Sequence, residues 1–400
     1  MNDNTPITLQ NEYTSSDDRT LSIMVFIDAL GWEVLKNREF MEAELPYRRK
    51  LKSVFGFSSA CVPSILTGRT PRDHGHWSYF YYSPKTSPFK TLNLLRVLPK
   101  SLSDRGRVRH LLSRLLAKIY GFTGYFQIYN MPLKFAGLFD YCEKNDIFKP
   151  GGMNQGDNIF DVLSRNDVPY HVSNWRNCEE DNLKACHDDI EQGKIRFAFL
   201  YMASMDGLLH RVGKESSDVD IKIDWYEKEM KQILDTAHQH YDEVRIHICS
   251  DHGMATVNKT IDLMKTIEAL PVQYGKDFVA VYDSTMARFW FHNEEARKII
   301  YNALQGEKSG RILSDDELVE LGCDFENQKF GETIFLVDPG VIIVPSHMGL
   351  KPITGMHGYH PDHPDSDAAL LSNVSPAGNV EAITDLFELM KVESGIRATS

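Results

Sequence analysis

Acidic and imidazole side chains recur directly after apolar runs, at positions where they could meet and hold a divalent metal ion. The runs are LSIMVFIDA, FAFLYMAS and VRIHICS, and a sixth residue lies in the glycine-rich segment ITGMHGYHP. The residues are Asp28, Asp206, His210, Asp251, His252 and His357. In an open α/β sheet, ligands bind beyond the carboxyl ends of the strands, so such residues can share one crevice. Asp and His together suit zinc or a similar ion, whereas calcium sites use oxygen alone.

Each of these residues also has an ordinary structural explanation. An Asp at the end of a strand, such as Asp28, often caps the following helix. Asp206 and His210 are four residues apart, which places them on one helical face, where they could form a surface pair. The Asp251–His252 dipeptide in CSDHGMA could simply make a turn before Gly253. All of these explanations would have to hold independently, so the series as a whole favours a site.

A candidate nucleophile lies in FGFSSACVPSILTGRTPRDHGHW, residues 55–77. Ser58 and Ser59 follow a short strand-like segment, and Pro63 stands where a first helical turn would tolerate it. A serine at that end of a helix lies near its positive pole, where phosphate is also favoured. Two serines before a helix are more commonly a cap, and His74 and His76 are more commonly turn residues. The absence of G-x-S-x-G argues against a serine esterase of the α/β-hydrolase type.

The elements that must position these residues alternate between strands and helices. Apolar runs at 21–29, 195–203 and 244–250 predict strands buried on both faces of a parallel sheet. Helical spacing predicts helices over 31–45 and 219–240. This alternation predicts an α/β fold, a doubly wound and mostly parallel sheet with helices on both faces.

Two stretches interrupt that rhythm and predict insertions into a single catalytic α/β domain spanning 20–400. Residues 77–150 begin with the aromatic run WSYFYY and contain the basic segment KSLSDRGRVRHLLSRLLAK, for which a solvated helix is the simplest interpretation. Residues 258–345 mix a strand-like ARFWFHN with a helical EEARKIIYNALQ. We expect the first to form a lid and the second an accessory subdomain.

Composition limits the classes of partner. The chain has 44 Lys and Arg against 56 Asp and Glu, a formal net charge of -12, which argues against a broad nucleic-acid-binding surface. No apolar run is long enough to span a bilayer, so no membrane partner is expected. The six cysteines form no C-x-x-C pair, and reduced thiols in a cytoplasmic protein are the simplest interpretation. The first twenty residues show no secretory signal, although a trimmed secreted or periplasmic chain would look the same.

The ordered blocks FIDALGW, GFSSACVPSILTGRTPRDHGH, SMDGLLHRVG, ICSDHGM and GMHGYHP resemble the alkaline phosphatase superfamily. The chain is most similar to its nucleotide pyrophosphatase/phosphodiesterase branch. The resemblance spans residues 21–360 apart from the two insertions. It implies a metal-dependent phosphohydrolase, namely a phosphodiesterase or nucleotide pyrophosphatase, that acts on a small phosphate ester or nucleotide. Phosphomonoesterase, phosphonate hydrolase and a non-catalytic anion-binding relative are the alternatives, and a phosphoglycerate-type mutase is disfavoured because its inserted domain is not recognisable.

The resemblance also implies two divalent ions, zinc or alternatively manganese, and a serine nucleophile. One ion would be held by Asp28, Asp251, His252 and the nucleophile, and the other by Asp206, His210 and His357. In this superfamily the nucleophile stands ten residues before the glycine of a T-G pair, which selects Ser58 by counting back from Gly68. Ser59 is the alternative, because the x-P that usually follows the nucleophile is missing here.

Three further features of the sequence bear on this assignment. C-V-P-S at 61–64 begins like the modified-cysteine motif of sulfatases, but Ile65 replaces its Arg and Cys61 lies only seven residues before Gly68. Cys61 is therefore interpreted as a small buried residue. Arg69 and Arg72 are candidates for a guanidinium clamp on the substrate. The aromatic run 77–82 could stack on a nucleobase, although packing under a lid is the favoured role.

Overall fold

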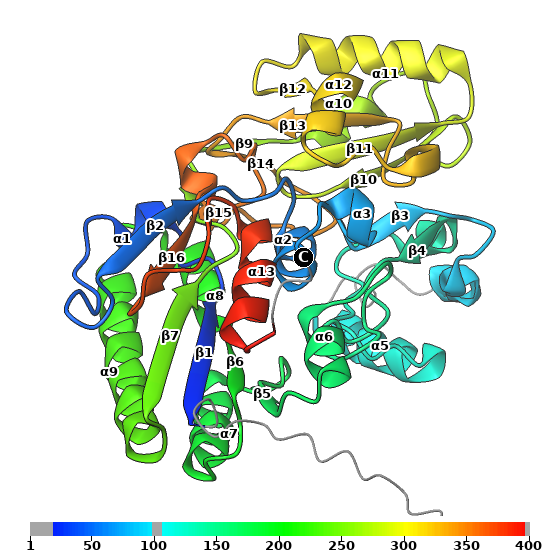
Figure 1. The fold of residues 1–400 in the computed structure, drawn as a ribbon. Coiled ribbons are helices and arrows are strands. Elements are labelled where there is room, and N and C mark those ends of the chain that lie inside the picture. Colours follow the sequence, from blue (N-terminus) through cyan, green and yellow to red (C-terminus); the bar gives the residue numbers. More distant parts are fainter. Residues whose placement is uncertain (1–18, 98–105, 397–400) are drawn as a thin grey trace, which may run out of the picture.

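The computed structural model describes residues 19–97 and 106–396, and a six-stranded sheet lies at its centre (Figure 1). The strand order is β2-β16-β7-β1-β6-β5. Strands β7, β1, β6 and β5 are parallel, whereas β16 runs antiparallel to both β7 and β2. The bounds are β1 Thr20–Ile27, β2 Tyr47–Leu51, β5 Tyr170–Val172, β6 Phe197–Met202, β7 Glu243–Cys249 and β16 Ala368–Ser372. The three apolar runs are therefore strands, as predicted.

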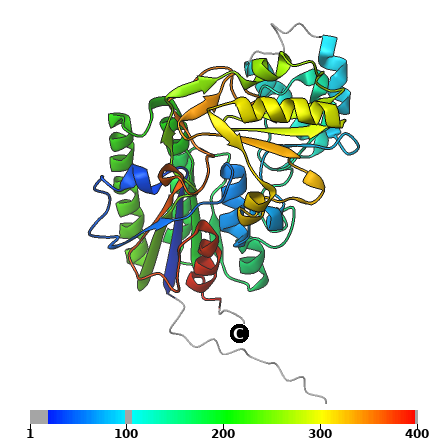
Figure 2. The same ribbon diagram turned by 90° about the horizontal axis from the view of Figure 1, so that it is seen from above.

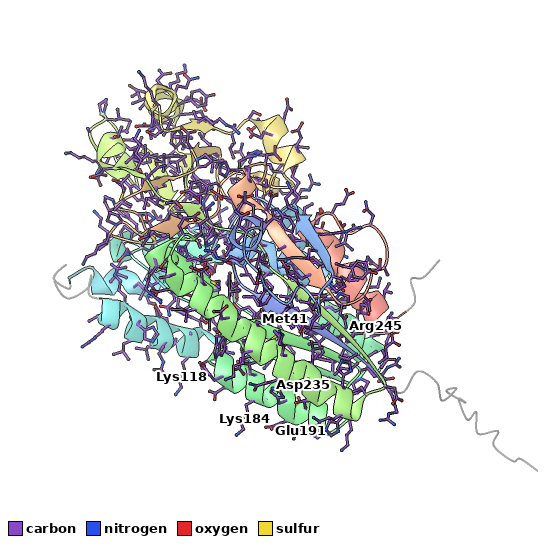
Figure 3. All side chains as sticks on the ribbon, turned by 90° about the vertical axis from the view of Figure 1, so that its left-hand side faces the viewer. Met41, Lys118, Lys184, Glu191, Asp235 and Arg245 are labelled. Carbon is purple, nitrogen blue, oxygen red and sulfur yellow. The ribbon has the colours of Figure 1, made fainter. Side chains whose placement is uncertain are left out.

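Helices cover both faces of this sheet, which confirms the predicted fold class. On one face, Ile23 and Val25 of β1 belong to the same buried cluster as residues of α7 (Glu179–Glu191) and α9 (Ser217–His240). On the other face, Phe26 packs in a cluster with α2 (Ser58–Thr67), α6 (Ile159–Arg165) and α13 (Leu386–Glu393). The outer sides of α7 and α9 carry charged side chains such as Lys184 and Asp235, labelled in Figure 3.

The helix predicted over 219–240 is confirmed by α9, but the one predicted over 31–45 is wrong in length. The structure has only α1 (Trp32–Leu35) there, followed by turns. Met41 adopts a positive φ of 49°, which a right-handed helix excludes. Phe40 and Met41 are nevertheless buried. The apolar spacing therefore indicated correctly that these side chains are buried. A compact loop can bury them as well as a helix can.

A second, antiparallel sheet lies beside the first, in the order β10-β11-β13-β12. The strand and the helix predicted within 258–345 are present in this region as β11 and α11. Its elements are α10 Leu263–Glu268, β10 Phe278–Tyr282, β11 Met286–Phe291, α11 Glu294–Gly306, β12 Gly310–Ile312, α12 Asp315–Glu320 and β13 Thr333–Val337. Two strand pairs connect this region with the first sheet, namely β8 Ala255–Thr256 with β15 Gly355–Met356 and β9 Lys259–Ile261 with β14 Val341–Ile343.

Residues 77–97 and 106–150 pack against that second sheet (Figure 2). They contain β3 (Phe80–Tyr82), which pairs with β4 (Phe139–Tyr141), and the helix α5 (Gly106–Tyr120). Short 3-10 helices, Pro88–Val97 and Leu133–Leu138, flank α5. Phe80 and Phe139 share a buried cluster with Val279 and Trp290. The boundaries 20–400, 77–150 and 258–345, and the role of a lid, stay predictions.

In the described part of the chain, no helix is both long and apolar enough to cross a membrane. The amino-terminal residues used in the localisation argument lie mostly outside the described residues, as do residues 100–105 of the basic segment.

Candidate metal centre and active site

The carboxyl ends of β1, β6 and β7 lie side by side and bring the predicted metal ligands together. The register pairs Ile27 with Met202 and Phe26 with Cys249, so the loops after the three strands leave the sheet at one edge. The loops after β1 and β7 also touch through their backbones. A Cβ on Gly31 would lie 2.3 Å from the Cα of Gly253, so glycine at position 31 permits this approach.

Asp28, Asp251 and His252 form the first group, whose ligand atoms all lie within 4.8 Å of one another. His252 Nε2 is 3.1 Å from Asp251 Oδ2 and 3.9 Å from Asp28 Oδ1. His252 Nδ1 lies 3.0 Å from the carbonyl oxygen of Gly253. Donation of the Nδ1 proton to that carbonyl leaves the Nε2 lone pair directed at the two carboxylates, as a metal ligand requires.

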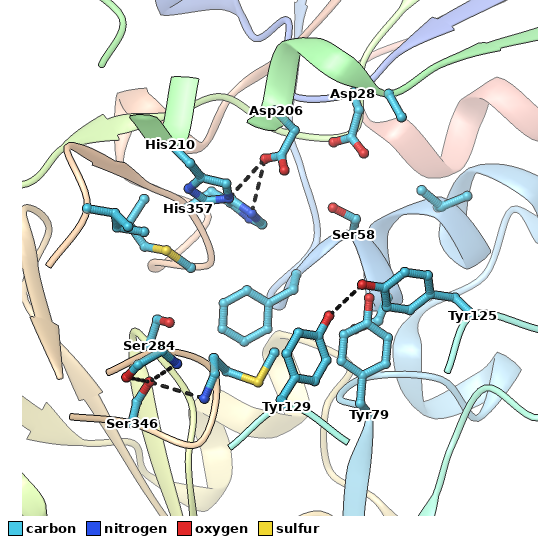
Figure 4. A pocket seen from close by; sticks show the side chains of 18 of the residues that line it. Asp28, Ser58, Tyr79, Tyr125, Tyr129, Asp206, His210, Ser284, Ser346 and His357 are labelled. Atoms are coloured by element: carbon cyan, nitrogen blue, oxygen red, sulfur yellow. Dashed lines mark hydrogen bonds and ion pairs between the residues drawn. The ribbon is translucent and has the colours of Figure 1, made fainter. Parts of the chain in front are cut away.

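Asp206, His210 and His357 form the second group, shown in Figure 4. Asp206 and His210 lie one turn apart on α8 (Ser204–Val212), and His357 follows β15. Asp206 Oδ1 lies 3.2 Å from His210 Nε2 and 3.5 Å from His357 Nε2. His210 Nδ1 lies 2.8 Å from the carbonyl oxygen of Gly355, which orients this ring in the same manner as that of His252.

The two groups are in direct contact. The rings of His252 and His357 stack with their centroids 3.8 Å apart and an interplanar angle of 11°. Three buried carboxylate oxygens, one on each Asp, accept no hydrogen bond from a described residue: Asp28 Oδ1, Asp206 Oδ1 and Asp251 Oδ2. Buried charged oxygens without a partner are costly, and a bound cation removes that cost. The Asp and His donors therefore fit two ions of the zinc type.

The pKa values of these groups show how strongly the charges interact. Burial and repulsion from Asp251 and Asp206 raise the pKa of Asp28 well above its ordinary value. Burial opposes a charge on His252, but the carboxylates of Asp251 and Asp206 and the carbonyl oxygen of Gly253 together outweigh it and raise the pKa of that imidazole. Burial and the neighbouring His252 hold the pKa of His357 well below its usual range. The neighbouring carboxylates thus oppose the ionisation of Asp28, and a bound cation would relieve this repulsion.

Helix α2 places the hydroxyl of Ser58 beside the first group. The helix begins at Ser58, and Ser58 Oγ lies 3.0 Å from His252 Nε2. Ser59 Oγ instead donates a hydrogen bond of 2.7 Å to the carbonyl oxygen of Trp77. The expectation that Pro63 lies in the first turn is wrong, because the helix starts five residues earlier and Pro63 is in its interior. Ser58 as the nucleophile stays a prediction.

A cavity of about 500 Å³ opens beside Ser58. Predicted site residues line it: Asp28, Ser58 and its alternative Ser59, Asp206, His210 and His357. One wing is aromatic, with Tyr79, Tyr125, Tyr129, Tyr201 and Trp175 around the carboxyl of Glu143. The other wing consists largely of β14 and the segment from Ser346 to Ile353. The cavity therefore offers the metal centre two neighbouring compartments of different chemistry.

The aromatic wing presents hydrogen-bond donors to the metal centre. Figure 4 shows the hydroxyls of Tyr79, Tyr125 and Tyr129 gathered on the side of their rings that faces Ser58. The Tyr125 and Tyr129 hydroxyl oxygens are 2.9 Å apart. Burial raises the pKa of all three phenols, so they stay protonated. Burial also raises the pKa of Glu143, which accepts a 3.2 Å bond from the Tyr125 amide, to about 8.

Sequence reasoning missed most of this wing. Tyr79 was part of the aromatic run that we identified, but Tyr125, Tyr129, Glu143 and Trp175 come from segments without a recognisable pattern. Of the run 77–82, Trp77 and Phe80 are buried in the core, in line with the favoured packing role.

Other residues weighed from the sequence lie away from the cavity. Arg69 and Arg72 line a different surface hollow, where Arg72 pairs with Asp324 at 2.6 Å. His74 is buried, with Nε2 2.9 Å from Ser64 Oγ. Cys61 is also buried, and its Sγ lies 3.5 Å from Ser53 Oγ.

A carboxylate that was not predicted holds the start of α8. The N-cap residue of α8, Ala203, has no oxygen in its side chain. Glu179 Oε1 accepts hydrogen bonds from the Ser204 amide at 2.9 Å and from the Tyr226 hydroxyl at 2.7 Å. Glu179 Oε2 accepts from Lys222 Nζ at 2.6 Å and from the Ser204 hydroxyl. Glu179 therefore fixes the helix end that carries Asp206.

The sequence model of one protein family, type I phosphodiesterase / nucleotide pyrophosphatase, matches residues 22–360. Among curated proteins, none matches the chain by sequence. Solved structures are similar in fold. Human ectonucleotide pyrophosphatase / phosphodiesterase 5 superimposes with a TM-score of 0.67 at 14% identity, over 95% of this chain and 96% of that chain. An inactive variant of the murine enzyme in complex with AMP gives a TM-score of 0.67 at 15% identity, over 95% of this chain and 96% of that chain.

Proposed function

Because the chain belongs to the type I phosphodiesterase / nucleotide pyrophosphatase family, and is thus a hydrolase of phosphoric ester bonds, we propose that it is a two-metal phosphodiesterase with Ser58 as its nucleophile. The observation that carries this proposal is the position of Ser58 Oγ, 3.0 Å from His252 and next to two adjoining groups of metal-ligand residues. A hydroxyl at the positive end of a helix, facing a cavity, suits attack on a bound phosphate.

Each group of residues would hold one divalent ion. Asp28, Asp251 and His252 would hold the ion nearer Ser58, and Asp206, His210 and His357 the other. When bound, such ions supply Lewis-acid chemistry, lowering the pKa of a coordinated hydroxyl and offsetting charge on the phosphoryl oxygens. Three Asp carboxylates against two dications leave the centre net positive, which suits an anionic substrate in an acidic protein.

The chain's own contribution to the chemistry is the serine and its orientation. The hydroxyl of Ser58 loses its proton to solvent, and Ser58 Oγ forms a bond to phosphorus while the bond from phosphorus to the leaving oxygen breaks. The leaving oxygen takes the electron pair and then a proton from solvent. Water then cleaves the phosphoseryl intermediate, which restores the serine and releases the phosphoryl product. Both steps gain mostly from positioning and electrostatic stabilisation.

The aromatic wing supports a nucleotide as the substrate. The murine protein of similar fold was solved with AMP, and the rings of Tyr79, Tyr125 and Trp175 line this wing of the cavity. Base–aromatic stacking accepts any base, and protonated phenols donate hydrogen bonds to sugar or base oxygens. The nucleoside part would therefore lie in the aromatic wing, with the leaving group in the wing formed by β14 and residues 346–353.

The proposal is tested with chromogenic esters in added zinc. We expect faster hydrolysis of bis-p-nitrophenyl phosphate and of p-nitrophenyl thymidine 5′-phosphate than of p-nitrophenyl phosphate. A preference for the monoester would indicate a phosphomonoesterase, and a preference for p-nitrophenyl sulfate would overturn the assignment. Absence of turnover with every ester, in protein that contains two equivalents of zinc, would indicate a binding protein.

A further inference from the structure

Helix α5 carries a stripe of apolar side chains that the protein leaves exposed. Leu111 is 68% exposed, Leu115 53% and Ile119 63%, and Val108 at 36% continues the stripe. The spacing of three, four and four residues places all four side chains on one side of the helix. An adjacent side of the helix packs into the protein, where Leu116 belongs to a buried cluster and Leu112 packs against it. The exposed apolar side chains are thus not the ones that attach the helix to the protein.

A basic stripe runs beside the apolar one. Arg107, Arg114 and Lys118 are exposed and lie along the helix at spacings of seven and four residues. Within the described part of the chain, none of the three forms an ion pair, and Figure 3 shows Lys118 pointing away from the protein. The helix GRVRHLLSRLLAKIY contains no acidic residue, although the chain as a whole has a net charge of -12. Positive charge is therefore concentrated on this helix.

The helix is firmly attached to the body of the protein. Arg109, on the buried side, donates to the carbonyl oxygens of Tyr129 and Met131 at 2.7 Å and 2.8 Å. Ser113 Oγ accepts a 3.0 Å bond from the Ile128 amide. The segment held by these bonds includes Tyr129, which lines the cavity beside Ser58. Helix α5 is therefore joined by hydrogen bonds to a segment that lines the candidate active site.

We infer that the exposed side of α5 docks onto an anionic phospholipid surface. Leu111, Leu115 and Ile119 would enter the boundary between headgroups and acyl chains, and Arg107, Arg114 and Lys118 would contact the phosphates. With its fifteen residues, α5 is about 22 Å long, so it would lie along the membrane surface and not cross it. This differs from the two expectations drawn from the sequence, a fully solvated helix and no membrane partner.

A lipid surface explains the arrangement better than a folded protein partner. Parallel apolar and basic stripes on one helix match the layered chemistry of a bilayer surface, where apolar chains lie beside phosphate groups. The inference does not depend on the proposed function, because vesicle binding is measured without turnover.

The test is co-sedimentation of the full chain with vesicles. We expect binding to vesicles of equal parts phosphatidylcholine and phosphatidylglycerol that is roughly 100-fold stronger than binding to phosphatidylcholine alone, from three basic residues near the surface. The variant L111S/L115S/I119S should lose binding to both vesicles. The variant R107Q/R114Q/K118Q should bind the two vesicles equally.

Matched controls separate this surface from general stickiness. Ile221 on α9 is 66% exposed and Val319 on α12 52% exposed, so I221S and V319S should bind like the wild type. All of these positions are exposed, and unchanged melting temperatures and circular dichroism would show that the variants fold. Equal sedimentation of the wild type and L111S/L115S/I119S, or no sedimentation of the wild type, would overturn the inference. So would dimerisation that depends on Leu111 in the absence of vesicle binding, because the stripe would then be a self-association surface.

Discussion

Ser58 and Ser59 are neighbours in the sequence, but their hydroxyls have opposite environments. Ser58 Oγ lies 3.0 Å from His252 Nε2, whereas Ser59 Oγ donates to the carbonyl oxygen of Trp77. Successive residues of a helix point about 100° apart, so at the start of α2 only one of the two can face the metal centre. The sequence left open which of the two serines is the nucleophile. Their different contacts mean that mutation of each serine should have a different effect.

Ser58→Ala should reduce turnover of a phosphodiester by more than about 1000-fold, because the group that forms the covalent intermediate is lost. Zinc content should remain near that of the wild type, since the six Asp and His side chains are retained. The measurements are steady-state kinetics with bis-p-nitrophenyl phosphate and metal analysis of the same sample.

Ser59→Ala is the matched control. It removes a buried hydrogen bond and should cost about 1 kcal/mol of stability, with activity within a few-fold of the wild type. If Ser59→Ala is inactive and Ser58→Ala is active, the assignment of the nucleophile is wrong by one residue.

Five of the six Asp and His ligands could be predicted because each follows a strand that its own sequence reveals. Uninterrupted apolar runs identified β1, β6 and β7, and parallel strands present their carboxyl ends at one edge. Asp28, Asp206 and Asp251 were therefore bound to come close, whatever lay between them. His357 was identified in the glycine-rich segment ITGMHGYHP without a preceding strand pattern, and the resemblance to a known superfamily assigned it to the second metal.

The rest of the cavity could not be predicted, because its residues depend on packing between distant segments. Tyr125 and Tyr129 follow α5, Trp175 follows β5, and Glu143 follows β4. Nothing in the local pattern of any one segment shows that the others lie opposite. Glu179 was missed for a related reason, because its function depends on contacts with Ser204 and Lys222, 25 and 43 residues away.

Glu179→Gln should weaken metal binding at the Asp206–His210–His357 group by about tenfold, the lower end of the effect of losing an outer-shell partner. The substitution removes a charge that holds the start of α8 and leaves Lys222 without its partner. Isothermal titration with zinc measures the affinity, and kinetics at saturating zinc should largely restore kcat. Ser204→Ala, which keeps the amide donor, is the control and should have a smaller effect. A Glu179→Gln enzyme with unchanged zinc affinity would show that Glu179 only stabilises the fold.

Glu143 should make stability depend on pH. Burial raises its pKa to about 8, whereas the pKa in the unfolded chain is about 4.3. Between these values the folded protein holds a proton that the unfolded chain has lost, so stability falls as pH rises from about 5 to about 8. At about 1.4 kcal/mol per pKa unit the loss amounts to several kcal/mol.

Glu143→Gln removes that proton exchange and serves as the comparison. Urea denaturation at pH 5 and at pH 8.5 should show the variant to be less sensitive to pH than the wild type, with the larger difference at pH 8.5. Identical pH dependence of the two proteins would mean that the carboxyl is ionised in the folded state at neutral pH.

Asp28→Asn should have opposite effects on the metal-free and the metal-loaded protein. Without metal, Asp28 is a buried carboxyl next to Asp251, with a pKa raised well above its ordinary value. Its ionisation therefore destabilises the fold as pH rises, and the amide removes this cost, so the variant should melt at a higher temperature than the wild type in EDTA at pH 8. With zinc at 1,000 times the dissociation constant, the wild type should gain about 4 kcal/mol per site, and the variant should gain much less, because it lacks one charged ligand of the first group. The order of the two melting temperatures should consequently reverse between EDTA and zinc.

Asp235→Asn, at an exposed position of α9, should follow the wild type in both conditions. A variant that is less stable than the wild type in EDTA would contradict the buried repulsion at Asp28. One that gains as much from zinc would contradict the assignment of Asp28 as a metal ligand.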